Sequence, residues 1–223
     1  MLTRGVTKHI GFDASSEMWL LLQRLLDETA GKRLLAVAYW GAIDAVSHMH
    51  GPSDRAFDAE VRSFCFALQR EFLAGLSRPA AGRTLLLLLA DHGQQDVRPE
   101  AALALDDHPA LMDQLVLPPG GEPRAAYFYV RNGRASAVRS YLEQQAGAKL
   151  AVVSGEAAFE GQLFGPGTPH PRAGDRVGDL IALAQGPSYV RFPQDEGRTL
   201  GRHGALAPEE MLVPLIWTRL DRT

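Results

Sequence analysis

The feature that most limits the fold is a pair of short apolar segments on either side of a long amphipathic segment. Residues 34–39 and 84–90 are almost continuously apolar, and the second contains five consecutive leucines. Such runs are typical of strands buried on both faces of a sheet that helices cover. Between them, residues 54–77 repeat apolar side chains at helical spacing. This order predicts an α/β fold with a mostly parallel sheet flanked by helices.

The remaining segments extend this prediction to the whole chain. Residues 13–30 have helical spacing behind Asp13, a candidate N-cap. From about residue 100 to 198 the chain is richer in Pro and Gly, and we interpret this part as a small inserted β-α-β lobe followed by a return to the sheet. Its strand and helix patterns cover residues 126–130, 134–146, 150–153 and 179–184. With a last strand at 213–217, residues 1–223 are expected to form a single domain.

Charge and composition argue against several functions. The 223 residues carry a formal net charge of -3 and a sequence pI near 6.2, so we expect no general nucleic-acid binding and no binding to anionic membranes. Apolar runs such as residues 85–90 are far too short to span a bilayer. Residues 1–5 are not followed by the apolar region of a secretory signal. The sequence predicts a soluble protein and leaves its compartment open.

Acidic and histidine side chains follow both predicted strands. Asp44 and His48 lie four residues apart, so one helical turn would direct both side chains to one point. Asp91 and His92 follow the second strand directly, and Gly93 relieves backbone crowding there. Because ligand sites of such sheets gather beyond the carboxyl ends of the strands, the two pairs are expected to be neighbours. Together they offer oxygen and nitrogen ligands of the kind that zinc takes.

A third histidine lies near the end of the chain. His203 stands between glycines, in Gly201-Arg202-His203-Gly204, and Pro208 predicts the start of a short helix. Each motif alone also has an ordinary structural interpretation, as a solvated turn for Asp44 and His48 and as a loop residue for His203. Their combination and order are far more specific.

In this order the motifs resemble the type I phosphodiesterase/nucleotide pyrophosphatase family of the alkaline phosphatase superfamily. The resemblance rests on residues 39–52, 89–93 and 201–215 and spans most of the chain. It implies an alkaline phosphatase-like fold and metal-dependent hydrolysis of phosphodiester or pyrophosphate bonds. The implied substrate is a small phosphoester or a nucleotide, and the implied cofactors are two divalent metal ions, usually zinc.

The resemblance also assigns metal ligands. Asp44, His48 and His203 would hold one metal, and Asp91 and His92 would belong to the second. In the family the second metal also takes an Asp near the N-terminus and a nucleophilic Thr or Ser. Two such ions about 4 Å apart clamp a phosphoryl oxygen and lower the pKa of the nucleophile.

The beginning of the chain departs from the family pattern. Residues 1–12 contain neither a strand ending in Asp nor the helix start where the nucleophile belongs, and no nearby Ser or Thr stands in the nucleophile motif. We therefore expect this chain to lack the catalytic nucleophile and to hold an incomplete second metal site. The missing N-terminal segment, or another chain, would have to supply the rest.

Three further side chains are candidates for binding substrate. His50 lies two residues after a candidate ligand, and His170 and Arg176 lie in the predicted lobe. Solvated loop residues are the alternative for all three.

Two other functions stay open. Phosphomonoesterases and hydrolases of phosphonates or sulfate esters belong to the same superfamily and share the metal ligands. A truncated, non-catalytic metal-binding domain is the alternative from another class.

Overall fold

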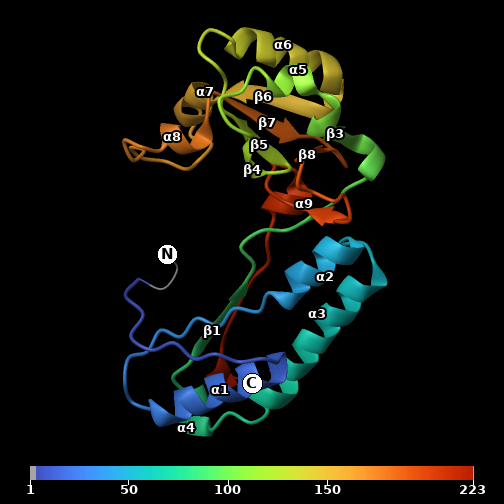
Figure 1. Ribbon diagram of the computed structural model, residues 1–223. Coiled ribbons are helices and arrows are strands. Elements are labelled where there is room, and N and C mark those ends of the chain that lie inside the picture. The colour runs from blue at the N-terminus through green and yellow to red at the C-terminus, as the bar shows by residue number, and fades with distance from the viewer. Residues whose placement is uncertain (1–3, 223) are drawn as a thin grey trace. The chain divides into compact units, whose positions relative to one another are not determined.

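A computed structural model describes residues 4–222. Residues 1–3 and 223 lie outside the description, and residues 1–3 are the first part of the segment in which we looked for a nucleophile. The chain forms two compact units (Figure 1). Unit 1 comprises the described residues up to Asp44 together with Arg55–Leu89 and those from Pro214 on. Unit 2 comprises Ala45–Asp54 and Ala90–Val213. A single domain with an inserted lobe stays a prediction from the sequence.

Helices form the core of unit 1. They are α1 (Ser15–Glu28), α3 (Arg55–Ala67), its π-helical continuation η1 (Leu68–Leu73) and α4 (Arg78–Ala81). Trp19 of α1 packs against Phe64 and Phe72, with ring centroids 5.3 and 5.5 Å apart. Both long helices are therefore confirmed, but α1 begins after Ala14. Asp13 is not the N-cap that we predicted, because Ala14 holds that position with an extended backbone and no side-chain capping hydrogen bond.

The two strands of unit 1 pair with each other. β1 (Leu85–Leu89) and β10 (Leu215–Arg219) are antiparallel, with Leu87 opposite Trp217. Leu86 and Leu88 pack on the helical core, whereas Leu87 is 54% exposed on the other face. The prediction that this strand is buried on both faces is therefore wrong. An apolar run indicates that both faces of a strand are suited to burial. It does not identify the residues that would cover each face.

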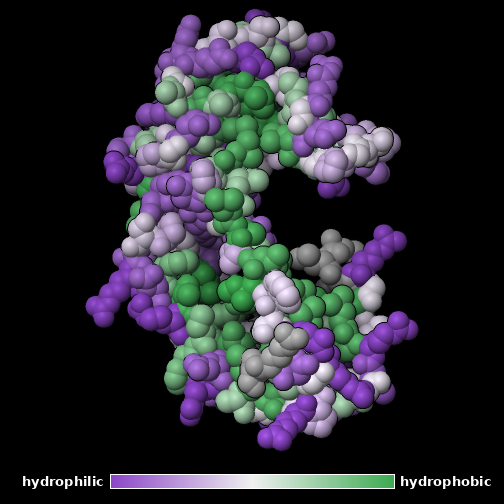
Figure 2. Space-filling view, turned by 180° about the vertical axis from the view of Figure 1, so that it is seen from behind, coloured by the Kyte–Doolittle hydropathy of each residue, from purple (hydrophilic) through white to green (hydrophobic). Residues whose placement is uncertain are grey.

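Residues 34–39 are also exposed, apart from the half-buried Ala36. This segment forms no strand, and Leu35 and Val37 are 90% and 85% exposed. The prediction of a buried strand is wrong here, because within residues 4–222 no neighbouring strand pairs with its backbone. Apolar side chains consequently gather on the surface of this unit (Figure 2). Cys65 is exposed as well and does not pack in the core.

A four-stranded antiparallel sheet forms the centre of unit 2, in the order β4-β5-β7-β6. Its strands are β4 (Gly120–Glu122), β5 (Ala125–Phe128), β6 (Leu150–Ser154) and β7 (Leu180–Ala184). α6 (Ala135–Ala146) covers one face through Leu142, which contacts the cluster around Phe128 and Ala182. α7 (Gly155–Glu160) and α8 (Gly174–Val177) contribute Ala158 and Val177 to the other face. Because β5 and β6 both run antiparallel to β7, they are parallel to each other, as in the predicted β-α-β lobe.

Shorter elements complete the chain. β2 (Gln95–Asp96) pairs antiparallel with β9 (Gly201–Arg202), and β3 (Ala102–Ala104) pairs parallel with β8 (Tyr189–Arg191). The short helices are α2 (Ala42–His50), α5 (Pro109–Met112), α9 (Pro208–Met211) and 3-10 turns at Pro99–Ala101, Leu105–Asp107, Gly147–Lys149 and Leu220–Arg222. None of the helices within the described range is long and apolar enough to cross a membrane.

Strand direction corrects one part of the predicted fold. The chain has the expected α/β content, but among the strand pairs of residues 4–222 only β3 and β8 are parallel. The expected parallel arrangement depended on residues 34–39 lying in a sheet with residues 85–89. Since the first of these segments is not a strand, that pairing does not form.

Leu142 provides a test of the core of unit 2. Its side chain is fully buried, so Leu142→Ala is expected to lower the free energy of unfolding by about 2–5 kcal/mol. Leu117 is 47% exposed, and Leu117→Ala is expected to cost less than about 1 kcal/mol. Urea denaturation followed by circular dichroism measures both. Equal losses in the two variants would contradict the packing described.

Candidate metal centre

Helix α2 positions the first two candidate ligands. Asp44 lies in its first turn and His48 one turn later, so the two side chains leave the same face of the helix. The buried Ser47 donates a hydrogen bond of 2.7 Å to the side-chain oxygen of Gln94, which anchors α2 in unit 2.

Strand β9 brings His203 next to His48. The ring centroids of the two histidines are 5.2 Å apart. Nδ1 of His48 lies 2.7 Å from the carbonyl oxygen of Gly201. Because a carbonyl only accepts hydrogen bonds, Nδ1 of His48 is the donor, and Nε2 is the ring nitrogen that remains to bind a metal. A hydrogen bond of this kind orients a histidine that binds metal through its other nitrogen.

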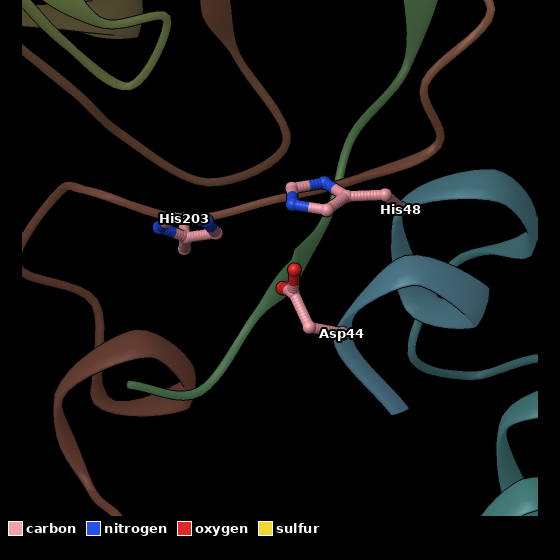
Figure 3. Close-up of side chains that lie close together, drawn as sticks. All are labelled: Asp44, His48 and His203. Carbon is pink, nitrogen blue, oxygen red and sulfur yellow. The ribbon is translucent and has the colours of Figure 1, made fainter. Parts of the chain in front are cut away.

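Asp44, His48 and His203 converge on one point (Figure 3). One ligand atom from each residue lies within 4.8 Å of the other two. Zinc binds oxygen and nitrogen ligands at about 2.0–2.2 Å, so the ligands of one ion are at most about 4.4 Å apart. A shift of less than about an ångström would therefore bring all three onto one ion. The predicted first ligand set is present as a spatial cluster.

The second predicted pair lies beside this cluster. The ring of His92 stacks on that of His203, with centroids 3.6 Å apart and an interplanar angle of 17°. Nε2 of His92 is 3.8 Å from an oxygen of Asp91. Nδ1 of His92 donates to the carbonyl of Gly93 at 2.9 Å, so Nε2 is the ring nitrogen that remains to bind a metal. Ligand roles for both residues stay predictions.

Two glycines allow these segments to approach each other. A Cβ atom on Gly93 would lie 2.0 Å from the carbonyl oxygen of Glu209, and one on Gly201 would lie 2.3 Å from that of Ser47. Both distances are far shorter than a van der Waals contact. The backbone N–H of Gly93 also donates to the carbonyl of Glu210 at 2.8 Å. The ligand segments are thus joined by contacts between backbones that a side chain would prevent.

A buried ion pair joins Arg124 to Glu210 of α9. Arg124 is fully buried and Glu210 is 3% exposed. The guanidinium donates to both carboxylate oxygens at 2.7 Å. Sequence reasoning missed both residues: Pro208 indicated only the start of a short helix, and no motif marked Arg124. A buried charge is not visible in a sequence until its partner is known.

A cavity of about 330 Å³ opens beside His48 and His203. It is also lined by Glu122, Pro123, Thr199 and Arg202. Arg202 is 6% exposed, donates to Asp195 at 2.5 Å and lies over the ring of Tyr189, 4.4 Å from its centroid. The volume is in the range of small-molecule sites, and the lining offers charges of both signs.

One tyrosine near Glu122 has a shifted acidity. Burial raises the pKa of Tyr127 above its usual range, and the neighbouring Tyr129 and Glu122 raise it further. The phenol of Tyr127 therefore stays neutral at pH 7 and adds no negative charge to this side of the unit.

The three candidates for substrate binding lie elsewhere. His50 is exposed at the end of α2. His170 is exposed, and its Nδ1 accepts the backbone N–H of Arg172 at 3.1 Å. Arg176 is exposed on α8. Within the described part of the chain none of the three lines the cavity, and their roles stay predictions.

Comparisons with known proteins give a family match and similar folds. The family described as Type I phosphodiesterase / nucleotide pyrophosphatase matches residues 4–206. Murine ectonucleotide pyrophosphatase / phosphodiesterase 5 is similar in structure, with a TM-score of 0.64 and 18% identity over 92% of this chain and 53% of that chain. The human protein has a TM-score of 0.68 and 17% identity, over 93% of this chain and 54% of that chain. Phosphonoacetate hydrolase from Sinorhizobium meliloti 1021 has a TM-score of 0.54 and 20% identity, over 78% of this chain and 43% of that chain.

The TM-scores show a shared fold, and the predicted α/β class is confirmed. No curated protein matches the sequence. The chain spans about half the length of the solved structures that it matches.

Replacement of Gly93 tests the close approach of the backbones. Gly93→Ala is expected to lower the free energy of unfolding by about 1–3 kcal/mol or more, because the new methyl group overlaps a backbone oxygen. A Cβ atom on Gly174 meets nothing within 4 Å, so Gly174→Ala is expected to stay within about 0.5 kcal/mol. Chemical denaturation measures both. A Gly93→Ala protein as stable as wild type would show that the two backbones are farther apart than described.

Proposed function

Because the chain belongs to the type I phosphodiesterase/nucleotide pyrophosphatase family, we propose that it forms the metal-binding part of a centre that hydrolyses phosphodiester or pyrophosphate bonds. The observation that carries this proposal is the convergence of Asp44, His48 and His203. One carboxylate and two imidazoles form a donor set that zinc commonly takes. This is why we propose zinc as the first metal.

The chain's own residues would bind and orient that ion. Hydrogen bonding through Nδ1 directs Nε2 of His48 outward and keeps the imidazole in one tautomer. Asp44 contributes one negative charge, so a divalent ion there would keep a net positive charge toward a phosphoryl group. When bound, the ion would supply the electrophilic stabilisation that such a reaction needs.

Asp91 and His92 are the ligands that we propose for a second ion. The stacking of His92 on His203 supports a position next to the first ion. Two protein ligands are fewer than the three or four that zinc usually takes from a protein. We propose that the remaining ligands and the nucleophilic hydroxyl belong to the part of the relatives that this chain does not match. A further segment or another chain would then provide them.

For the substrate, we propose a small phosphoester or a nucleotide bound in the cavity beside His48 and His203. One structure of the murine relative is a complex with AMP, which supports a nucleotide. The bacterial relative is a phosphonoacetate hydrolase in complex with phosphonoformate, which supports a phosphonate as the second candidate. A metal-binding domain that does not catalyse hydrolysis is the alternative from another class.

A zinc titration tests the proposed centre. We expect one tightly bound zinc ion per chain and little hydrolysis of a nitrophenyl phosphodiester. Because they remove a ligand, His48→Ala and His203→Ala are each expected to abolish tight binding, measured by competition with a chromogenic chelator. His9 is exposed and far along the sequence from every candidate ligand, so His9→Ala serves as the control and should bind like wild type.

Two results would contradict this proposal in different ways. Failure of the wild-type chain to bind zinc would rule out the centre itself. Two tight ions together with metal-dependent turnover would show instead that the second site and the nucleophile are complete.

A further inference from the structure

Glu210 contacts both of the loop segments that carry candidate ligands. Its backbone carbonyl accepts the N–H of Gly93 at 2.8 Å, and its carboxylate oxygen Oε1 accepts the N–H of Ala205 at 3.0 Å. Gly93 directly follows His92, and Ala205 is two residues after His203. One residue thus holds together the two segments whose imidazole rings stack at 3.6 Å.

Arg124 prevents the carboxylate of Glu210 from turning. Its Nε and one terminal nitrogen donate to the two carboxylate oxygens, each at 2.7 Å. Its other terminal nitrogen donates to the carbonyls of Gly186 and Ser188 at 2.8 and 2.6 Å. The Arg124 carbonyl in turn accepts the N–H of Ala184 at the end of β7. The guanidinium therefore ties Glu210 to the central sheet of unit 2.

Stability alone does not account for this pair. Two charges lose their hydration when they are buried, and well-packed apolar residues in their place are often as stable or more stable. An apolar pair would fill the same space. It would not accept the N–H of Ala205, and this hydrogen bond is what connects the pair to the segment of His203.

We propose that Glu210 is a positioning residue of the metal centre and that Arg124 holds it in place. This inference rests on the proposed function, because it assigns Glu210 an effect on the ion that Asp44, His48 and His203 would bind. Glu210 acts through the backbone of the ligand segments and does not itself touch the ion. Loss of such outer contacts typically weakens metal binding by about 10- to 100-fold.

Two double variants separate positioning from simple stabilisation. Arg124→Met/Glu210→Met removes both charges and the acceptor for Ala205. Arg124→Met/Glu210→Gln removes both charges and keeps a side-chain oxygen that can accept this N–H. Neither variant leaves an unpaired buried charge, so both are expected to fold, which near-ultraviolet circular dichroism and chemical denaturation check.

Cobalt(II) is the probe, because its visible absorption bands report the arrangement of its ligands. We expect the Met/Met variant to bind cobalt about 10- to 100-fold more weakly than wild type and with altered bands. The Met/Gln variant should recover most of the affinity and the wild-type bands. Asp179→Ala is the matched control, since it also removes a carboxylate that accepts a backbone N–H, that of Val130. It is expected to lower stability and leave cobalt binding unchanged.

The outcomes separate this inference from the proposed function. If wild type binds no cobalt, the proposed function fails. If wild type binds cobalt and the folded Met/Met variant binds it with the same affinity and bands, Glu210 does not position the centre. The inference also fails if Met/Gln shows no recovery over Met/Met, or if affinity in all variants, Asp179→Ala included, simply follows the loss of stability.

Discussion

At Gly93 the backbone runs so close to that of α9 that no side chain fits between them, and Gly201 repeats this constraint against α2. Glycine loses more conformational entropy on folding than any other residue. The hydrogen bonds from Gly93 to Glu210 and from His48 to Gly201 offset part of this cost. The candidate centre thus depends first on backbones that touch, and the imidazole rings occupy positions which those contacts determine.

Hydrogen bonds around the candidate centre also restrict the positions of its side chains. Backbone carbonyls accept hydrogen bonds from Nδ1 of His48 and of His92, so Nε2 is the nitrogen that each ring has left to bind a metal. Glu210 and Arg124 then connect the ligand segments to a sheet whose two faces are covered by helices. Because buried charges are costly unless they are paired and hydrogen-bonded, these groups have few alternative arrangements.

Sequence reasoning found what depends on local spacing. Asp44 and His48 lie on one helical face because four residues make about one turn, and the β-α-β lobe follows from its apolar periodicity. Sequence reasoning failed where a segment's environment depends on distant residues. The apolar composition of residues 34–39 is that of a buried strand, yet no described strand pairs with them. Likewise, nothing near Arg124 in the sequence indicates that its partner is Glu210.

The pairing of β1 with β10 bears on the order in which the chain folds. Leu89 lies opposite Leu215, so this ladder closes a loop that contains the whole segment from Ala90 to Val213. Closing so long a loop costs conformational entropy. While the intervening chain is disordered, the hydrogen bonds and contacts of two strands offset only a small part of that cost. That segment has its own sheet and core, whose contacts are closer along the chain. Once this segment has folded, the loop to be closed is effectively short, and β1 and β10 can pair at little further entropic cost.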